Sequence, residues 1–250
     1  MIYLTGFHAI EEHIKSGKAG KGPLLLAKGG PRAREIAALA LEHKIRVDRV
    51  GTSDLDRLAP DHRGIALQTE DPVSAPGTDI TLEDFIAGLG DKKDVLVLIL
   101  DGITDPHNYG AILRSCDQFA VDLVVSAKRR NAKHADVIAR TSAGAVSYVP
   151  AAEAANLSRA ACDLKKAGFW IYGADMKGKP VHTIDLTGRA AIVLGEEGSG
   201  ISRLLREHCD AMAAIPAPGR IDSLNVSVAA GILLYEALCQ RNAALRQRRA

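Results

Sequence analysis

Apolar runs that are short enough for strands recur along the second half of the chain. Residues 95–100 form a continuous apolar run between charged residues, which is typical of a strand buried on both faces of a parallel sheet. Helical segments separate most of the runs, and this alternation predicts a mainly parallel α/β sheet. We expect the further strands at 121–126, 169–173, 190–194 and 211–215.

The first 70 or so residues alternate in the same way and predict a smaller α/β unit. Helices are expected at 7–15 and 31–43, with a short one at 53–58 capped by Ser53; strands are expected at 23–27, 45–50 and 64–69.

Residues 70–79 contain two prolines and a glycine and resemble a linker, and Thr81 then caps a new helix at 81–89. The predicted division is therefore a first domain at 1–72, a linker with an entry helix at 73–92 and a second domain at 93–250.

The composition is that of an ordinary globular protein, with 47% hydrophobic residues, 25% charged residues and a formal net charge of +2. Composition alone therefore does not require a nucleic-acid partner. Two basic clusters are either solvated faces or phosphate contacts: one at 128–134, and one formed by Arg241, Arg246, Arg248 and Arg249.

The four cysteines are far apart, which argues against a zinc site and against a disulfide framework, so we expect no metal. At least three lie in apolar helical patterns, where a buried free thiol is the usual state. The polar start and the shortness of the apolar runs predict no cleavable signal, no membrane partner and a cytoplasmic protein.

Three segments that follow predicted strands carry the candidate chemistry, because ligands of open parallel sheets bind beyond the carboxyl ends of the strands. After the first strand a helix is expected to begin near Asn108, with Arg114 about one and a half turns into it. A lone helix arginine is usually a surface residue, but the apolar neighbours of Arg114 favour a functional role.

The second segment is the glycine-rich turn 195–200, which contains Glu196 and Glu197 and precedes a helix expected at Ile201. It matches neither a P-loop nor a dinucleotide-binding fingerprint. The third is the segment 215–227, an irregular loop after which Ser223, Asn225 and Ser227 open a long apolar helix expected at 226–238. Polar residues there can cap the helix or bind a ligand.

Together the segments LDGITDPHNYGAILRSC, IVLGEEGSGIS and IPAPGRIDSLNVSVAAGILLYEAL resemble the three motifs of the SpoU/TrmH family of RNA ribose methyltransferases. In the first half, GFHAI at 6–10 and HRGIA at 62–66 are similar to the substrate-binding module of the family's RlmB-like branch. The resemblance implies a C-terminal α/β-knot (SPOUT) methyltransferase domain with a trefoil knot, and a small N-terminal L30e-like RNA-binding domain.

The resemblance also implies the site. The implied catalytic residues are Asn108, Arg114, Glu197, Ser223 and Asn225, and the implied contacts with S-adenosylmethionine are Gly173, Leu194, Gly195, Ile215 and Leu224. Glu196 stands where relatives often have a small residue, and Glu197 fits the functional glutamate better. Family members are homodimers in which one subunit can complete the site of the other.

The implied activity is methyl transfer from S-adenosylmethionine to a ribose 2′-hydroxyl of RNA, most consistent with a guanosine of 23S ribosomal RNA. The alternatives are a tRNA 2′-O-methyltransferase of the same family and a non-catalytic RNA-binding relative. A generic nucleotide-binding Rossmann enzyme is disfavoured because the fingerprint is absent.

Overall fold

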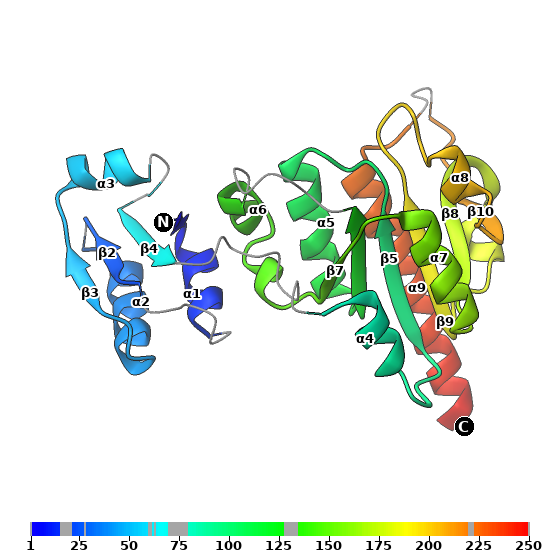
Figure 1. Ribbon diagram of the computed structural model, residues 1–250, viewed down its shortest axis with the longest axis horizontal. Coiled ribbons are helices and arrows are strands. Elements are labelled where there is room, and N and C mark those ends of the chain that lie inside the picture. The colour runs from blue at the N-terminus through cyan, green and yellow to red at the C-terminus, as the bar shows by residue number, and fades with distance from the viewer. Residues whose placement is uncertain are drawn as a thin grey trace.

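The computed structural model describes residues 2–15, 22–27, 29–59, 62, 64–69, 80–127, 135–219 and 223–249. The chain forms two lobes, each built on its own sheet (Figure 1). The predicted linker and the basic cluster at 128–134 lie outside the described residues.

The N-terminal sheet has the strand order β1-β4-β2-β3. Its strands and helices are β1 (Ile2–Thr5), α1 (Phe7–Lys15), β2 (Leu24–Leu26), α2 (Pro31–Glu42), β3 (Val47–Arg49), α3 (Thr52–Leu58) and β4 (Ile65–Thr69). The strand β1, which pairs antiparallel with β4, is not among the predicted strands. The predicted cap of α3 is wrong: the helix begins at Thr52, so Gly51 is the N-cap and Ser53 lies within the first turn.

The C-terminal sheet is parallel throughout and has the strand order β10-β8-β9-β5-β6-β7. Its strands are β5 (Val95–Leu100), β6 (Leu123–Ala127), β7 (Ala151–Ala154), β8 (Trp170–Pro180), β9 (Arg189–Leu194) and β10 (Ala211–Ala214). The predicted mainly parallel α/β sheet is confirmed. The missed strand β7 has the sequence AAEA, which lacks the β-branched and aromatic residues that mark a strand.

Helices cover both faces of this sheet. The side chains of β5 alternate between two apolar cores, Leu96, Leu98 and Leu100 entering one and Val95, Val97 and Ile99 the other. The first core also takes α5 (Pro106–Gln118) and α9 (Val226–Arg249), and the second takes α4 (Leu82–Ala87), α7 (Leu157–Lys166) and α8 (Arg203–Arg206). In Figure 1, α7 lies in front of the sheet and α9 behind it.

Two further helical elements link the lobes. The helix α6 (Ala135–Thr141) contacts α1 and β1 of the N-terminal lobe and packs along α5. A 3-10 helix, η2 (Ala145–Ser147), also contacts α1. The contact of α6 with α5 is tight at Gly110, where an added Cβ would lie 1.9 Å from the Thr141 hydroxyl oxygen.

Several predicted helix ends differ from the structure. Thr81 caps α4 as predicted, accepting from the backbone N–H of Asp84. In contrast, α5 begins at Pro106 with Asp105 as its cap, so Arg114 lies more than two turns into the helix. The helix expected at Ile201 begins only at Arg203, and α9 continues to Arg249, well beyond the predicted end.

Arg241 anchors α9 to the sheet. Its guanidinium donates to the backbone carbonyls of Leu186 (3.1 Å), Val95 (3.1 Å) and Gly188 (2.9 Å). Desolvation by the surrounding protein lowers the pKa of Arg241, although a guanidinium stays protonated at ordinary pH. Three of its five N–H donors are thus bonded to backbone carbonyls, which gives Arg241 a structural role, and a phosphate contact by this basic cluster stays a prediction.

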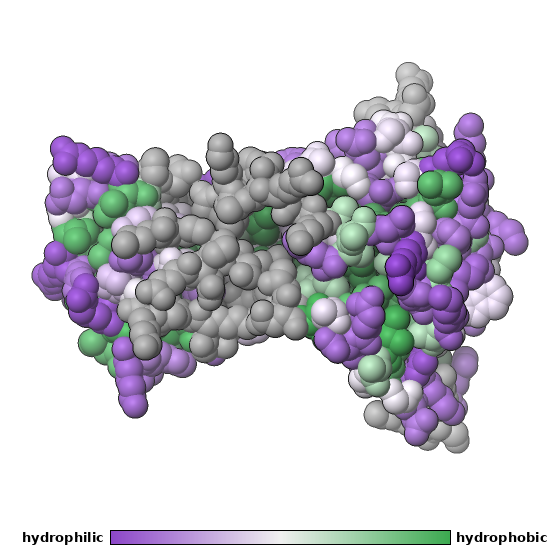
Figure 2. Space-filling view, in the orientation of Figure 1, coloured by the Kyte–Doolittle hydropathy of each residue, from purple (hydrophilic) through white to green (hydrophobic). Residues whose placement is uncertain are grey.

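The described surface carries both hydrophilic and hydrophobic residues. Hydrophilic residues cover much of the described surface on the face shown in Figure 2. Within the described residues, no helix combines the length and the apolar character needed to cross a membrane. All four cysteines are free; Cys116 is buried, whereas Cys239 is exposed, and Cys209 lies after α8 rather than in a helix.

Candidate active site

The parallel register of β5 and β9 brings the first two motif segments together. Leu100 pairs with Leu194 at the carboxyl ends of these neighbouring strands, and the backbone N–H of Asp101 donates to the Leu194 carbonyl. The segments that follow, 101–114 and 195–200, therefore leave the sheet side by side. Asp101 then accepts from the backbone N–H of Ser202 (2.7 Å), which joins the far end of the second segment to the first.

Three side chains, one from each motif segment, form a hydrogen-bonded cluster. The Nδ2 of Asn225 donates to the Oε1 of Glu197 (2.8 Å) and to the Oδ1 of Asn108 (3.0 Å). The Nδ2 of Asn108 donates to the same Glu197 oxygen at 3.4 Å, and so does the backbone N–H of Val226 at 3.2 Å. We call these three residues the amide–carboxylate cluster. It joins residues that are up to 117 positions apart in the chain.

The start of α9 fixes the orientation of Asn225. Its Oδ1 accepts from the backbone N–H of Ser227 (2.9 Å) and from the Ser227 hydroxyl (2.6 Å), as a capping residue does. The amide nitrogen of Asn225 is thereby turned toward Glu197 and Asn108. Ser227 lies in the third motif but was not among the predicted site residues, and it is the residue that sets this orientation.

The two glutamates of the turn 195–200 make different contacts. Glu196 and Gly200 form a two-bond antiparallel bridge, and the Glu196 carboxylate accepts from the Ser199 hydroxyl (2.8 Å). Glu196 therefore stays within the turn, whereas Glu197 reaches the amide–carboxylate cluster. The contacts thus distinguish the two carboxylates that the sequence placed next to each other.

Gly195 is required by the fold of this turn. A Cβ at Gly195 would lie 2.2 Å from the backbone carbon of Gly200 and 2.3 Å from the backbone nitrogen of Ile201. No real Cβ approaches that closely, so the turn folds back on itself only because Gly195 has no side chain.

Two of the predicted catalytic residues remain apart from the cluster. Arg114 is exposed on α5 and, among the described residues, has no hydrogen-bond or ion-pair partner. Ser223 is also exposed and makes no hydrogen bond to a cluster residue. Within this one subunit the structure therefore joins Asn108, Glu197 and Asn225 and leaves Arg114 and Ser223 outside their contacts.

The predicted cofactor contacts follow three neighbouring strands. Gly173 lies on β8, Leu194 ends β9 and Ile215 follows β10; the first two are buried and Ile215 is half-buried. Leu224, just before α9, is 41% exposed. Among the described residues, the backbone of 216–219 and of Leu224 makes no hydrogen bond, so its polar groups are open to a ligand.

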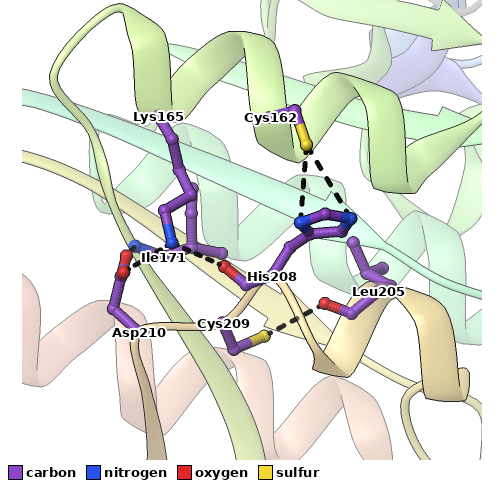
Figure 3. A network of polar contacts seen from close by, with 7 residues as sticks. All are labelled: Cys162, Lys165, Ile171, Leu205, His208, Cys209 and Asp210. Atoms are coloured by element: carbon purple, nitrogen blue, oxygen red, sulfur yellow. Dashed lines mark hydrogen bonds and ion pairs between the residues drawn. The ribbon is translucent and has the colours of Figure 1, made fainter.

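The connection from α8 to β10 is tied to α7 and β8 by polar contacts (Figure 3). The Asp210 carboxylate accepts from the backbone N–H of Ile171 (2.8 Å) and from the Lys165 ammonium (2.6 Å), and Lys165 also donates to the His208 carbonyl. The Cys162 sulfur lies 3.4 Å from the Nδ1 of His208. Within the described residues, no group of three or more potential ligands could hold a metal ion.

The fold and the site define a parallel α/β protein whose polar cluster lies beyond the carboxyl ends of the strands. The chain belongs to the SpoU rRNA methylase family, whose model matches residues 95–235. A second model, for RNA 2′-O ribose methyltransferase substrate binding, matches residues 3–73. The predicted family is thereby confirmed.

Relatives of known name match nearly the whole chain. The 23S rRNA (guanosine-2′-O-)-methyltransferase RlmB of Xanthomonas campestris pv. campestris is 38% identical over 246 residues, which cover 96% of each chain. The crystal structure of an RNA 2′-O ribose methyltransferase matches 95% of this chain and 88% of its own, with a TM-score of 0.74 and 26% identity.

A further match shows the fold alone. The SpoU methyltransferase AviRb of Streptomyces viridochromogenes, solved in complex with AdoMet, has a TM-score of 0.71 at 22% identity, covering 95% of this chain and 89% of that one. The predicted fold class is confirmed by these likenesses, whereas the trefoil knot and the domain boundaries stay predictions.

Proposed function

We propose that this protein transfers a methyl group from S-adenosylmethionine to a ribose 2′-hydroxyl of RNA, with a guanosine of 23S ribosomal RNA as the substrate and the cytoplasm as its place of action. The observation that carries the proposal is the amide–carboxylate cluster, to which each of the three motif segments contributes one side chain. The 38% identity to a 23S rRNA guanosine methyltransferase along nearly the whole chain supports the choice of substrate.

The residues at the strand ends fit this cofactor. Its adenine and methionine parts need apolar surface together with main-chain donors and acceptors. Ile215 and Leu224 offer accessible apolar surface, and the unbonded backbone of 216–219 offers polar groups beside it. When bound, S-adenosylmethionine supplies an electrophilic methyl group on a sulfonium. Gly173 and Gly195 contribute differently, because neighbouring residues pack so closely against both positions that a side chain would not fit.

The catalytic role of the protein is chiefly to hold the reacting groups in line. Positioning of this kind can supply a large part of a rate enhancement. Glu197 fixes both amides of the cluster, which can then hold the target ribose in place. Arg114 would hold the target phosphate through two parallel N–H donors. Because a guanidinium stays protonated, that phosphate or a water molecule receives the proton of the 2′-hydroxyl.

The position of Arg114 favours a homodimer in which the arginine completes the partner's site. Arg114 is exposed and unpartnered among the described residues, on a helix that packs along α9. On α9, Val228, Ile232 and Tyr235 form an apolar stripe at helical spacing and are 49%, 38% and 57% exposed. A second copy that buries this stripe would bring its own Arg114 close to the cluster of the first.

Subunit mixing tests the shared site. Arg114→Ala and Asn225→Ala should each lose about a hundredfold or more in turnover. If the sites are shared, half of the dimers in an equimolar mixture combine the two variants, and each of these dimers has one intact site of two. The mixture should then recover about a quarter of wild-type activity. No recovery would show that Arg114 acts within its own subunit. Sedimentation should show that Val228→Asp yields monomers, whereas Leu41→Asp, at an exposed leucine on α2, leaves the dimer intact.

The function itself is tested by mapping 2′-O-methyl groups in ribosomal RNA from cells with and without this protein. One guanosine of 23S ribosomal RNA should lose its methyl group in the deletion strain and regain it in vitro with purified protein and S-adenosylmethionine. A methyl group lost from tRNA instead would contradict the proposed substrate. Failure of the protein to bind S-adenosylmethionine in calorimetry would contradict the enzymatic function.

A further inference from the structure

One segment of β8 leaves the sheet next to the proposed cofactor site. The pairing of β8 with β10 passes from Gly173, opposite Met212, directly to Lys179, opposite Ala213. Residues 174–178 therefore have no partner on β10, and the pairing of β8 with β9 has already ended at Gly173. We call these residues the β8 excursion. They follow directly after a predicted cofactor contact.

Glycines allow both ends of the β8 excursion to pack tightly against β10. A Cβ at Gly173 would lie 2.6 Å from the Cε of Met212 and 2.9 Å from the Cδ1 of Ile201. A Cβ at Gly178 would lie 2.5 Å from the backbone of Met212. Both ends of the excursion are thus held against one residue of β10. The excursion itself is solvated, and Met176 is 63% exposed.

Asp175 ties the β8 excursion to α8. One of its carboxylate oxygens accepts from the backbone N–H of Lys177 (2.8 Å), and the other forms a short ion pair with the guanidinium of Arg206. The side chains of Arg206 and Asp175 are 44% and 21% exposed, so the pair lies near the surface and solvent screens it in part. These contacts also lower the pKa of Asp175, first through the Lys177 N–H and then through Arg206, which keeps the carboxylate ionised at neutral pH.

The helix α8 is a fixed support for this pair. It follows directly from the turn 195–200, and its preceding residue Ser202 is bonded to Asp101. Beyond its other end, His208 and Asp210 are bonded to α7 and β8 (Figure 3). The Asp175–Arg206 pair therefore joins the β8 excursion to an element that is anchored on both sides and that continues into the glycine turn.

We propose that Asp175 and Arg206 are positioning residues, which hold the β8 excursion against α8 and so set the width of the S-adenosylmethionine site between β8 and the turn 195–200. The inference rests on the proposed function, because it concerns the same site. Neither side chain needs to touch the cofactor. The pair acts by keeping the chain beyond Gly173 and the chain beyond Gly195 at a fixed separation, so that the cofactor does not have to order them on binding.

The test is the affinity for S-adenosylmethionine, measured by calorimetry on the full-length protein. Asp175→Asn keeps an acceptor for Lys177 and removes the charge, and Arg206→Ala removes the cation. Each should raise the dissociation constant about two- to fivefold, and the double variant should bind no more weakly than the weaker of the two single variants. At saturating S-adenosylmethionine, kcat should stay near wild type while KM for S-adenosylmethionine rises.

The matched control is Arg203→Ala, which removes the exposed ion pair between Arg203 in α8 and Glu207 directly after the helix. It should leave the affinity unchanged. If Asp175→Asn and Arg206→Ala both left the affinity for S-adenosylmethionine unchanged, with or without a lower Tm, the inference would be overturned and the proposed function would stand. Equal weakening by Arg203→Ala would also overturn it. If the wild-type protein did not bind S-adenosylmethionine, the proposed function and this inference would fall together.

Discussion

The smallest informative change to the site is Gly195→Ala, which adds a single methyl group. That carbon would lie 2.2 Å from the backbone carbon of Gly200, so the turn 195–200 must move by more than 1 Å to reach an ordinary contact of 3.4 Å. The movement breaks the two backbone hydrogen bonds between Glu196 and Gly200. At about 1 kcal/mol each, their loss costs about 2 kcal/mol, which for a chain of this size corresponds to a fall in Tm of about 4–8 °C.

The same movement should weaken the cofactor site and the amide–carboxylate cluster together, because Glu197 lies in the displaced turn. We therefore expect Gly195→Ala to lower Tm, S-adenosylmethionine affinity and turnover. Calorimetry, thermal melting and a methylation assay would measure the three effects. Gly29→Ala is the control, since its added Cβ meets no atom within 4 Å.

The outcomes separate two roles for Gly195. If affinity fell while the Tm of the free protein stayed unchanged, the methyl group would be occupying ligand space, and the argument from the turn would be wrong. If neither changed, the tight contact with Gly200 would itself be refuted.

Three other outcomes follow from the structure. Arg241→Ala should lower stability by about 2–4 kcal/mol in denaturant unfolding, because three backbone carbonyls lose a charged donor, whereas the exposed Arg246→Ala should change it by under about 0.5 kcal/mol; equal effects would contradict the anchoring of α9. Burial raises the pKa of Cys116 far above its usual range, so at pH 8 its thiol stays protonated, and mass spectrometry should find it alkylated in denaturant but not in the folded protein; rapid alkylation of Cys116 in the folded protein would contradict its burial. A protein of residues 80–250 should still bind S-adenosylmethionine but bind RNA less tightly and with a weaker salt dependence than the full chain, as filter binding at two salt concentrations would measure; equal RNA affinity would leave the first 79 residues without this role.

The sequence predicted helices and strands well where a proline, a capping residue or a continuous apolar run defines them. Pro31 begins α2, Thr81 caps α4, and the continuous apolar run 95–100 is the central strand β5. It predicted strands poorly where contacts with distant parts of the chain determine the structure. The alanines of β7 become a strand only because β6 offers a parallel edge. At the start of the chain, the residue types of β1 indicated a strand, but four residues were too few to stand out.

The candidate site was predictable to the same degree. Residues after neighbouring parallel strands must lie close together, which explains the meeting of Asn108 and Glu197. Sequence could not show that Ser227 turns the amide of Asn225, because that depends on the exact start of α9. Nor could it distinguish the half-buried Arg241 from the exposed Arg246 at the same basic end of α9, since Arg241 differs only in the backbone carbonyls that lie beside it in the fold.

The order of strands in the C-terminal sheet has a consequence for how the protein folds. The strand β9 pairs with β5 on one side and with β8 on the other, although both precede it in the chain. During synthesis β5 therefore emerges about 90 residues before β9, and the edge of β5 that pairs with β9 stays open for that time. The centre of the sheet can therefore close only after residues 189–194 have been synthesised, and a chain released before that point would leave one edge of the apolar strand β5 open to aggregation.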